Sequence, residues 1–402
     1  MPHIDRRQAL KLLAALGATG LASACSVGTG DDDSAEETGL ISDEPVRIGL
    51  IVPQTGGYKP IGDEMLNGFQ LFLDNNERRF GGRPVDLVIA DEGETPQSGQ
   101  AAVESLLKQQ VLALTGVANS AVMLAIRDTV EQAQVPLVGS NASPRNLQSV
   151  VYIWRTSYVS DEPGLALGAY LAREVPDDGQ VAIVAADQPA GRDLVQGFRE
   201  AFGTSDERIA APVIWADPTP NPGRDTFTEA IGEVVSQDPA AVYCYFTGSA
   251  AVAFIRQLRD TGYDGPIYGP GFLTEGTVVD QLGDEATGIV TALNYSADLD
   301  NSANLRFASG YRKRFGASPT TYAMASYDAA QVLDKAIRTT DPGVSAQELN
   351  LALGRIGQID SPRGPWQFNQ PRTPQQKWYL REVLRDGTVL SNVLITELAT
   401  LG

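Results

Sequence analysis

Short runs rich in Val, Ile and Leu alternate with longer segments of helical periodicity along this chain, beginning at Val46. In the first half, strand candidates at 46–53, 85–91, 111–117 and 135–140 are separated by helix candidates at 63–79, 96–110 and 121–133. Strands that are joined by helical crossovers pair in parallel, with helices on both faces of the sheet. The alternation therefore predicts an α/β fold with a doubly wound, mostly parallel sheet.

The alternation repeats in the second half, with strand candidates at 180–187, 211–216, 240–246 and 266–270 and helix candidates between them. Irregular segments at 154–164, 294–304 and 359–370 interrupt the pattern. These interruptions predict two lobes joined by a three-segment hinge, with residues 45–158 and 293–362 in lobe 1 and residues 159–292 and 363–402 in lobe 2. Because open α/β sheets bind ligands beyond the carboxyl ends of their strands, we expect a ligand cleft between the lobes.

The N-terminus reads as an export signal over residues 1–24. Arg6 and Arg7 precede a short apolar core, and small residues then lead to Cys25. Residues 5–11 resemble a twin-arginine signal, and Leu-Ala-Ser-Ala-Cys resembles a lipoprotein cleavage site that would leave a lipid on Cys25. A simple cleaved secretion signal with an incidental cysteine is the alternative. Residues 25–44 are acidic and nearly free of apolar side chains, so we expect a flexible tether to a membrane, at the cell surface or in the periplasm.

Charge and histidine content exclude several function classes. Residues 1–24 hold three basic residues and one acidic residue, so the exported chain retains 28 Lys and Arg against 49 Asp and Glu, a balance of −21. This charge argues against nucleic acid or an anionic lipid surface as partner. The single histidine, His3, lies in the signal, which excludes Ser-His and Cys-His nucleophilic sites and His-ligated zinc. Cys244 lies in an apolar run and reads as a small buried hydrophobe.

Residues 115–128, TGVANSAVMLAIRD, predict a strand, a tight turn and the start of a helix. Ser120 stands in the turn beside Asn119. A serine in this place commonly caps the helix. Its hydroxyl and the free N–H groups of the helix start can instead hold a ligand. The residues alone leave both roles open.

A family resemblance covers nearly all of the exported chain. Nine stretches, in order, resemble the branched-chain amino acid/amide type of ABC transporter substrate-binding protein, the type I periplasmic binding proteins: VRIGLIVPQTGGY with GDEMLNGFQLFLDNN, GGRPVDLVIADEGETP, TGVANSAV, VPLVGSNASPRNL, WRTSYVSDEPG, AGRDLVQGFREAF, GFLTEG, YAMASYDAAQVL and GPWQFN. The resemblance implies a two-lobed receptor that captures a small polar ligand, such as an amino acid or amide, and delivers it to an ABC permease.

The resemblance also implies a set of ligand-binding residues. The turn at Asn119 and Ser120 would hold a carboxylate or carbonyl, and the following loop would hold both ends of an amino acid, with Ala142 at the family's Thr position. Asp161 and Glu275 would face an ammonium group; the alternatives are a hinge acid or helix cap for Asp161 and a helix-start acid for Glu275. The whole implied set is Tyr58, Asn119, Ser120, Ser140, Asn141, Ala142, Ser143, Asp161, Ala190, Phe246, Phe272 and Glu275.

Three function hypotheses follow. The leading one is a lipid-anchored, monomeric solute receptor of an ABC transporter, without metal or cofactor. The second is a sensory ectodomain on the same fold that signals to a kinase. The third is an enzyme, which we do not expect: the sequence has no P-loop, no GxGxxG after the first strand and no metal cluster, and leaves only a carboxylate pair such as Asp161 and Glu275.

Overall fold

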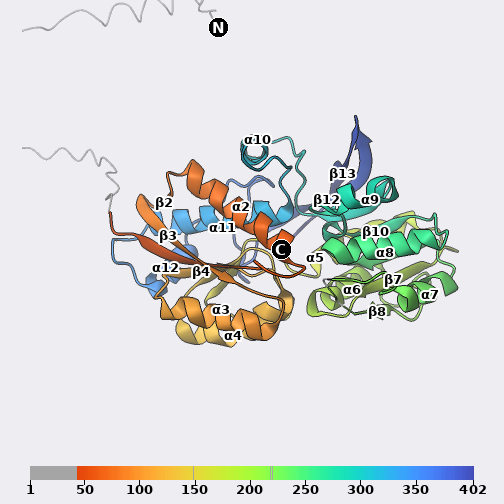
Figure 1. The fold of residues 1–402 in the computed structure, drawn as a ribbon, viewed down its shortest axis with the longest axis horizontal. Coiled ribbons are helices and arrows are strands. Elements are labelled where there is room, and N and C mark those ends of the chain that lie inside the picture. Colours follow the sequence, from red (N-terminus) through yellow and green to blue (C-terminus); the bar gives the residue numbers. More distant parts are fainter. Residues whose placement is uncertain (1–42, 148, 218, 220) are drawn as a thin grey trace, which may run out of the picture. The chain divides into compact units, whose positions relative to one another are not determined.

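The computed structural model describes residues 43–402, except residues 148, 218 and 220. The predicted export signal, Cys25 and nearly all of the predicted tether lie outside the described residues. The described chain forms two sheets, each flanked by helices, and the two sheets are built from successive parts of the sequence (Figure 1).

The first sheet has the strand order β2-β3-β1-β4-β5-β6. Its central strand β1 pairs in parallel with β3 and β4, and only the short β2 is antiparallel. Every residue of β1 except Arg47 is buried, as expected for a strand that is covered on both faces. The strands are β1 (Val46–Val52), β2 (Arg79–Phe80), β3 (Arg83–Asp91), β4 (Ala113–Gly116), β5 (Leu137–Gly139) and β6 (Ile153–Arg155).

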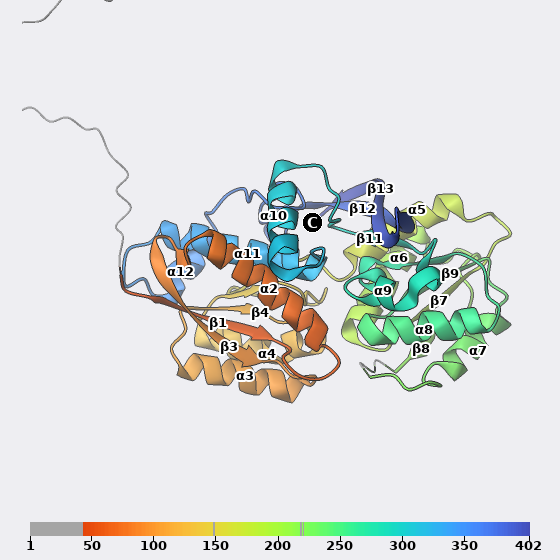
Figure 2. The same cartoon turned by 45° about the horizontal axis from the view of Figure 1, so that its top comes forward.

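Helices cover both faces of this sheet (Figure 2). On one face, α2 (Lys59–Asn75) packs against α11 (Thr321–Arg338), so closely that a Cβ on Gly68 would lie 1.9 Å from the Ala323 carbonyl oxygen. The other face carries α3 (Pro96–Lys108) and α4 (Ser120–Ala133). Two further helices, α10 (Ser302–Phe315) and α12 (Ala346–Leu353), also pack on this lobe.

The second sheet has the order β13-β12-β11-β10-β9-β7-β8. Strands β7 to β11 are parallel, whereas β12 and β13 form a long antiparallel hairpin at one edge. The strands are β7 (Val181–Ala186), β8 (Ile214–Ala216), β9 (Ala241–Tyr245), β10 (Ile267–Pro270), β11 (Val290–Leu293), β12 (Gln376–Asp386) and β13 (Val389–Leu401). The helices are α5 (Glu162–Glu174), α6 (Pro189–Phe202), α7 (Thr228–Ser236), α8 (Gly248–Asp260), α9 (Val278–Leu282) and the short η1 (Gly271–Thr274) and η2 (Gly283–Ala286).

The chain passes between the two sheets three times, at residues 156–161, 294–301 and 354–375. The three crossings meet at one backbone atom. The carbonyl oxygen of Ser157 accepts hydrogen bonds from Asn294 Nδ2 at 2.9 Å, Arg363 Nη1 at 2.8 Å and Gln376 Nε2 at 3.0 Å. The two-lobed α/β class predicted from the sequence is confirmed, while the residue boundaries drawn for the lobes remain predictions.

Several local predictions differ from the structure. Helix α2 begins at Lys59 rather than 63, because Pro60 in its first turn has the backbone angle that a helix start needs. The predicted helix end at 79 is instead a hairpin, in which Gly81 and Gly82 adopt positive φ. Strand β13 and helix α12 were not predicted.

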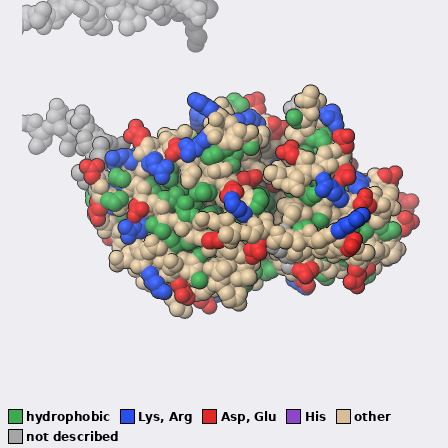
Figure 3. All heavy atoms as spheres, viewed as in Figure 1, with side chains coloured by type: hydrophobic (Ala, Val, Ile, Leu, Met, Phe, Trp, Pro, Cys, Tyr) green, Lys and Arg blue, Asp and Glu red, His purple; other side chains and the backbone are tan. Residues whose placement is uncertain are grey.

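Acidic and basic side chains are scattered over the face drawn in Figure 3 and do not gather into one basic surface. None of the helices in the described part of the chain is long and apolar enough to cross a membrane.

Candidate ligand-binding site

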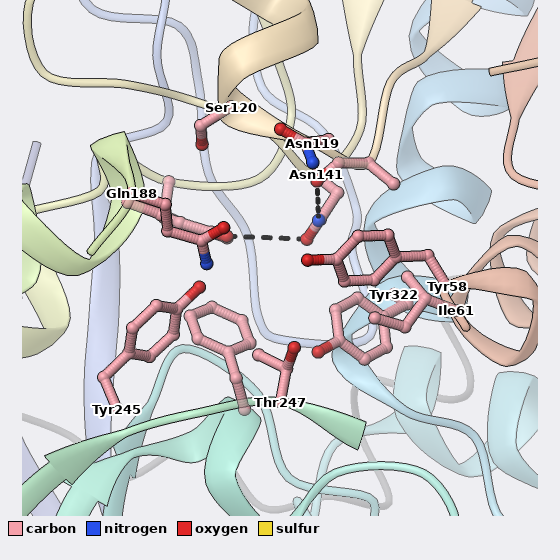
Figure 4. Close-up of a pocket in the computed structure, with 13 residues that line it drawn as sticks. Tyr58, Ile61, Asn119, Ser120, Asn141, Gln188, Tyr245, Thr247 and Tyr322 are labelled. Atoms are coloured by element: carbon pink, nitrogen blue, oxygen red, sulfur yellow. Dashed lines mark hydrogen bonds between the residues drawn. The ribbon is translucent and has the colours of Figure 1, made fainter. Parts of the chain in front are cut away.

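A pocket lies where the carboxyl ends of strands from both sheets meet (Figure 4). From the first lobe it is lined by the loops after β1, β4, β5 and β6 and by the start of α11. From the second lobe it is lined by the loops after β7, β9 and β10. The lining residues are Tyr58, Ile61, Ala118, Asn119, Ser120, Asn141, Tyr158, Gln188, Ala190, Tyr245, Thr247, Phe272 and Tyr322.

This lining contains no Asp, Glu, Lys or Arg side chain. It is aromatic instead. Phe272 forms its wall from the second lobe, with its ring centroid 5.2 Å from that of Tyr158 and 6.0 Å from that of Tyr322. Polar groups are hydroxyls and amides. A ligand here would be held by ring contacts and neutral hydrogen bonds.

The first-lobe side of the pocket is the turn between β4 and α4. The side chain of Asn119 caps the helix, with Oδ1 accepting the Ala121 N–H at 2.7 Å. Ser120 is the first helical residue and not the cap, so its capping alternative is wrong. Its hydroxyl points into the pocket (Figure 4), and its N–H lies in the first turn, where no carbonyl of the same helix can accept it. Capping is therefore complete without Ser120.

The same turn is held from behind by Glu92, which is fully buried at the end of β3. One carboxyl oxygen accepts the Ala118 N–H at 2.7 Å and the other accepts the Asn119 N–H at 2.8 Å. Burial raises the pKa of Glu92 to about 8, although both N–H bonds act to lower it. Glu92 was not among the predicted site residues.

Tyr58 lies directly before α2 and directs its hydroxyl toward the middle of the pocket (Figure 4). Its pKa is raised to about 12, by burial first and then by the nearby Glu94 and Glu92. The hydroxyl is therefore a neutral donor near pH 7. The side chain of Asn141 donates to the Ala118 carbonyl oxygen at 2.8 Å and accepts from the Tyr158 hydroxyl at 3.4 Å. These two hydrogen bonds fix the orientation of the Asn141 amide and connect it to Tyr158.

The second-lobe side offers Gln188, Tyr245 and Thr247 (Figure 4). Burial raises the pKa of Tyr245, whereas the neighbouring Gln188 side chain acts to lower it. Tyr245 ends strand β9 and Thr247 precedes α8, so both occupy the sheet edge at which α/β folds bind ligands.

A second pocket adjoins the first and shares Tyr58, Ile61, Thr247 and Tyr322 with it. Glu275 lies in its wall, but the two oxygens of this carboxylate have partners of their own. One oxygen accepts from buried Arg381 Nη1 at 2.7 Å and the other from the Thr321 N–H at 3.0 Å. Glu64, in the same wall, accepts from the Thr320 hydroxyl, and burial raises its pKa to about 8.

Six of the predicted site residues line the first pocket: Tyr58, Asn119, Ser120, Asn141, Ala190 and Phe272. Their contact with a ligand remains a prediction. Lys59, beside Tyr58, turns away from this pocket and pairs with Asp63 in an exposed ion pair.

The other six predicted residues have other partners. Ser140 bonds to the hydroxyl of Ser326, Ala142 is buried in the core cluster that includes residues of α3 and α4, and the carbonyl of Ser143 accepts from Ser160. Asp161 occupies the N-cap position of α5, as its capping alternative said, but its side chain makes no cap bond and pairs with Arg145 at 3.0 Å instead. Phe246 stacks on Phe254 in the core and also borders a small adjacent pocket with Gln188 and Thr247. Glu275 is paired with Arg381 and lies outside the first turn of the helix that follows it, although its second oxygen accepts the N–H of Thr321 at the start of α11.

Sequence reasoning missed several lining residues: Ile61, Ala118, Tyr158, Gln188, Tyr245, Thr247 and Tyr322. The strand-end rule could have found Tyr245, near the end of the run at 240–246, and Thr247, directly after it. It could not have found Tyr322, because α11 joins the first lobe only after the chain has crossed back.

The fold and its interlobe pocket define a class: a two-lobed solute receptor. The family model described as "Periplasmic binding protein" matches residues 45–388. The Leu/Ile/Val-binding protein homolog 6 of Brucella melitensis is 26% identical over 369 residues, which cover 87% of this chain and 91% of that protein. The chain belongs to the periplasmic binding protein family, as a type I, Leu/Ile/Val-binding-like solute-binding protein of an ABC transporter.

Solved structures agree with this assignment. A solute binding protein of an ABC transporter from R. palustris, in complex with benzoate, has 28% sequence identity and a TM-score of 0.81; the match covers 89% of this chain and 97% of that chain. The branched-chain amino acid transporter substrate binding protein LivJ from Streptococcus pneumoniae, in complex with isoleucine, has 19% identity and a TM-score of 0.76, over 88% of this chain and 99% of that chain. The second likeness concerns the fold alone. The family is one of extracytoplasmic binding proteins and not of enzymes.

Proposed function

We propose that this protein captures a small aromatic carboxylic acid, in preference to an α-amino acid, and delivers it to an ABC permease. The observation that carries the proposal is the uncharged, aromatic lining of the pocket. An α-amino acid would bring an ammonium group into this lining without a carboxylate to meet it. A buried charge without a partner is costly, whereas an aromatic ring gains contacts with Phe272, Tyr158 and Tyr322.

The two acids that the family resemblance implied as ammonium partners support the same conclusion. Asp161 is paired with Arg145, and Glu275 with Arg381. Recruiting either acid to a ligand would break its pair with an arginine; for the buried Glu275–Arg381 pair this leaves an uncompensated charge. The R. palustris relative solved with benzoate is consistent with this ligand class.

We infer that the carboxylate of the ligand lies at Ser120. The hydroxyl and N–H of this residue are donors, and the positive end of the α4 dipole adds to them. The ring would lie between Phe272, Tyr322 and Ile61, and a substituent opposite the carboxylate would approach Tyr245, Gln188 and Thr247.

Isothermal titration calorimetry against matched ligands tests the proposal. Benzoate and 4-hydroxybenzoate should bind at least tenfold more tightly than phenylalanine, which keeps the ring and carboxylate but adds an ammonium group and two carbons between them. 3-Phenylpropanoate has the same two carbons without the ammonium group and separates the effect of length from that of charge. Leucine and isoleucine test the aliphatic alternative. Tighter binding of phenylalanine, leucine or isoleucine than of benzoate would overturn the proposed ligand class.

We also propose that Cys25 carries a lipid that holds the protein at the extracytoplasmic face of a membrane. The support is the sequence of residues 1–25 and the acidic stretch that follows. Mass spectrometry of the mature N-terminus should detect a diacylglyceryl-modified Cys25, and Cys25→Ala should release the protein in soluble form. An unmodified mature N-terminus at another residue would contradict the anchor.

A further inference from the structure

Glu92 lies directly behind the pocket without being part of its lining. It is 0% exposed, and both of its carboxyl oxygens are bonded to N–H groups of pocket residues, Ala118 and Asn119. Ala118 and Asn119 directly precede Ser120, the first residue of α4. The carboxyl group of Glu92 is therefore bonded to the back of the turn from which Ser120 faces the pocket.

We propose that Glu92 is a specificity-determining residue that sets which ligand charge the pocket accepts: in its uncharged form it leaves the turn at Ala118–Ser120 attractive to an anion, and in its ionised form it opposes one. The proposal rests on the function proposed above, because it takes the ligand to be a carboxylate at Ser120. It adds the ionisation state of Glu92, a group of the protein itself, to what determines the choice of ligand.

The positive end of a helix dipole corresponds to roughly half a unit charge. An ionised Glu92 would outweigh that charge from a few ångströms away, in surroundings where burial weakens screening. A protonated Glu92 keeps the two N–H bonds, because the carbonyl and hydroxyl oxygens of a carboxylic acid both accept, and it removes the opposing charge.

The groups around Glu92 do not supply a compensating cation. In the described part of the chain no Lys or Arg forms an ion pair with it. Its neighbour Asp91 is an acid: burial acts to raise the pKa of Asp91, but hydrogen bonds from Gln54, Thr55 and Gly93 lower it. From other elements, Tyr58 at the start of α2 is a neutral phenol, Glu94 accepts the Gly57 N–H, and Ser98 of α3 bonds to the Glu92 backbone. Of these acids, Asp91 acts to raise the pKa of Glu92 and so favours its protonated form.

Thermodynamic linkage gives the direction of the effect. An anion bound at Ser120 favours the protonated form of Glu92, so binding takes up a proton where Glu92 would otherwise be ionised. A carboxyl group with a pKa of about 8 is mostly protonated one pH unit below this value and mostly ionised one unit above it. Affinity for an anion should therefore be constant up to about pH 7 and fall by roughly tenfold between about pH 7 and about pH 9.

The test measures the affinity for benzoate and for benzamide between about pH 6.5 and about pH 9. Benzoate stays ionised throughout this range, and benzamide has the same shape without the charge. Wild-type affinity for benzoate should fall as described, whereas affinity for benzamide should not change. In Glu92→Gln, the fall for benzoate should disappear, leaving only the dependence due to other raised carboxyls such as Glu64. Glu94→Gln removes a charge from the same loop and should keep the wild-type profile.

Proton uptake gives a measurement that does not depend on any variant. Calorimetry of benzoate binding at about pH 8, in two buffers with different ionisation enthalpies, should show net proton uptake by the wild-type protein. Benzoate binding with no pH dependence and no proton uptake would overturn the role of Glu92, as would an unchanged profile in a folded Glu92→Gln. Absence of binding by every aromatic acid would instead overturn the proposed function, and this inference with it.

Discussion

Ser120 and Asn119 divide two tasks between adjacent residues. Asn119 caps α4 through its side chain, and Ser120 directs its hydroxyl into the pocket. The sequence identified this turn but could not assign the tasks, because both residue types cap helices well. Asp161 and Glu275 could not be interpreted from sequence for a different reason. Arg145 lies on the loop after β5 and Arg381 on β12, and both pairings are set only by the fold.

Ser120→Ala should weaken binding of an aromatic acid by about 1.5–3 kcal/mol, the amount expected for one lost hydrogen bond to a charged group, and should leave the melting temperature unchanged. Asn119→Ala is the matched comparison. It removes the cap and should lower the free energy of unfolding by about 1 kcal/mol. Calorimetric affinity and thermal melting of both variants check the division of tasks. A lower melting temperature for Ser120→Ala with unchanged affinity would reverse it.

At the scale of elements, close helix packing depends on glycine at specific positions. A Cβ on Gly168 of α5 would lie 2.4 Å from the Phe198 carbonyl oxygen of α6, and one on Gly164 would lie 2.2 Å from the Leu194 carbonyl oxygen. Periodicity predicted both helices but not their closeness. It also missed β13, because that strand is half-exposed along most of its length and lacks the regular alternation of buried and exposed residues that marks a strand in sequence.

Gly168→Ala should destabilise the protein by about 1–3 kcal/mol, because the added methyl group meets backbone that cannot move aside without separating α5 from α6. Gly232 of α7 is the control, since a Cβ there meets nothing within 4 Å. Gly232→Ala should raise stability by about 0.4–1 kcal/mol through the lower backbone entropy of the unfolded chain. Chemical denaturation measures both changes. Equal effects of the two substitutions would contradict the packing argument.

At the scale of the whole molecule, a few polar contacts join the lobes around the pocket. Arg145, on the first-lobe loop after β5, donates its N–H to Asp193 at 2.8 Å and its guanidinium to Glu200 at 2.9 Å, both on α6 of the second lobe. The repeated α/β pattern and its three interruptions were enough to predict two lobes and their hinge. Contacts of this kind between lobes could not be predicted, because they depend on how far the lobes close.

Arg145→Ala should weaken ligand binding by roughly two- to fivefold although Arg145 does not line the pocket, since an ion pair of this exposure contributes about 0.5–1 kcal/mol to the closed arrangement. Small-angle scattering should show a wider ligand-free molecule. Arg47→Ala removes an exposed ion pair with Asp86 that lies within the first lobe and should change neither quantity. Unchanged affinity in Arg145→Ala would show that this ion pair does not contribute to closure.

Stability should fall as pH rises from about 5 to about 8. Burial raises the pKa of Glu162, in the first turn of α5, to about 7, and that of Glu64 to about 8. A carboxyl group whose pKa is higher in the folded state stabilises the fold at low pH, and this contribution is lost as pH rises through the folded-state value. Thermal melting across this range checks the direction, and Glu162→Gln should flatten the curve. A melting temperature that rises from pH 5 to pH 8 would contradict the assignment.

The convergence of the three crossings on the Ser157 carbonyl has a consequence for dividing the gene. A break in the crossing at 294–301 would give an N-terminal piece whose first sheet lacks α11 on one face, and a C-terminal piece that carries α11 together with the hairpin of β12 and β13. Neither piece contains a whole lobe, so neither should stay folded alone. Produced together they should reassemble around Ser157, which makes this crossing a suitable split point for a two-part reporter of the ligand.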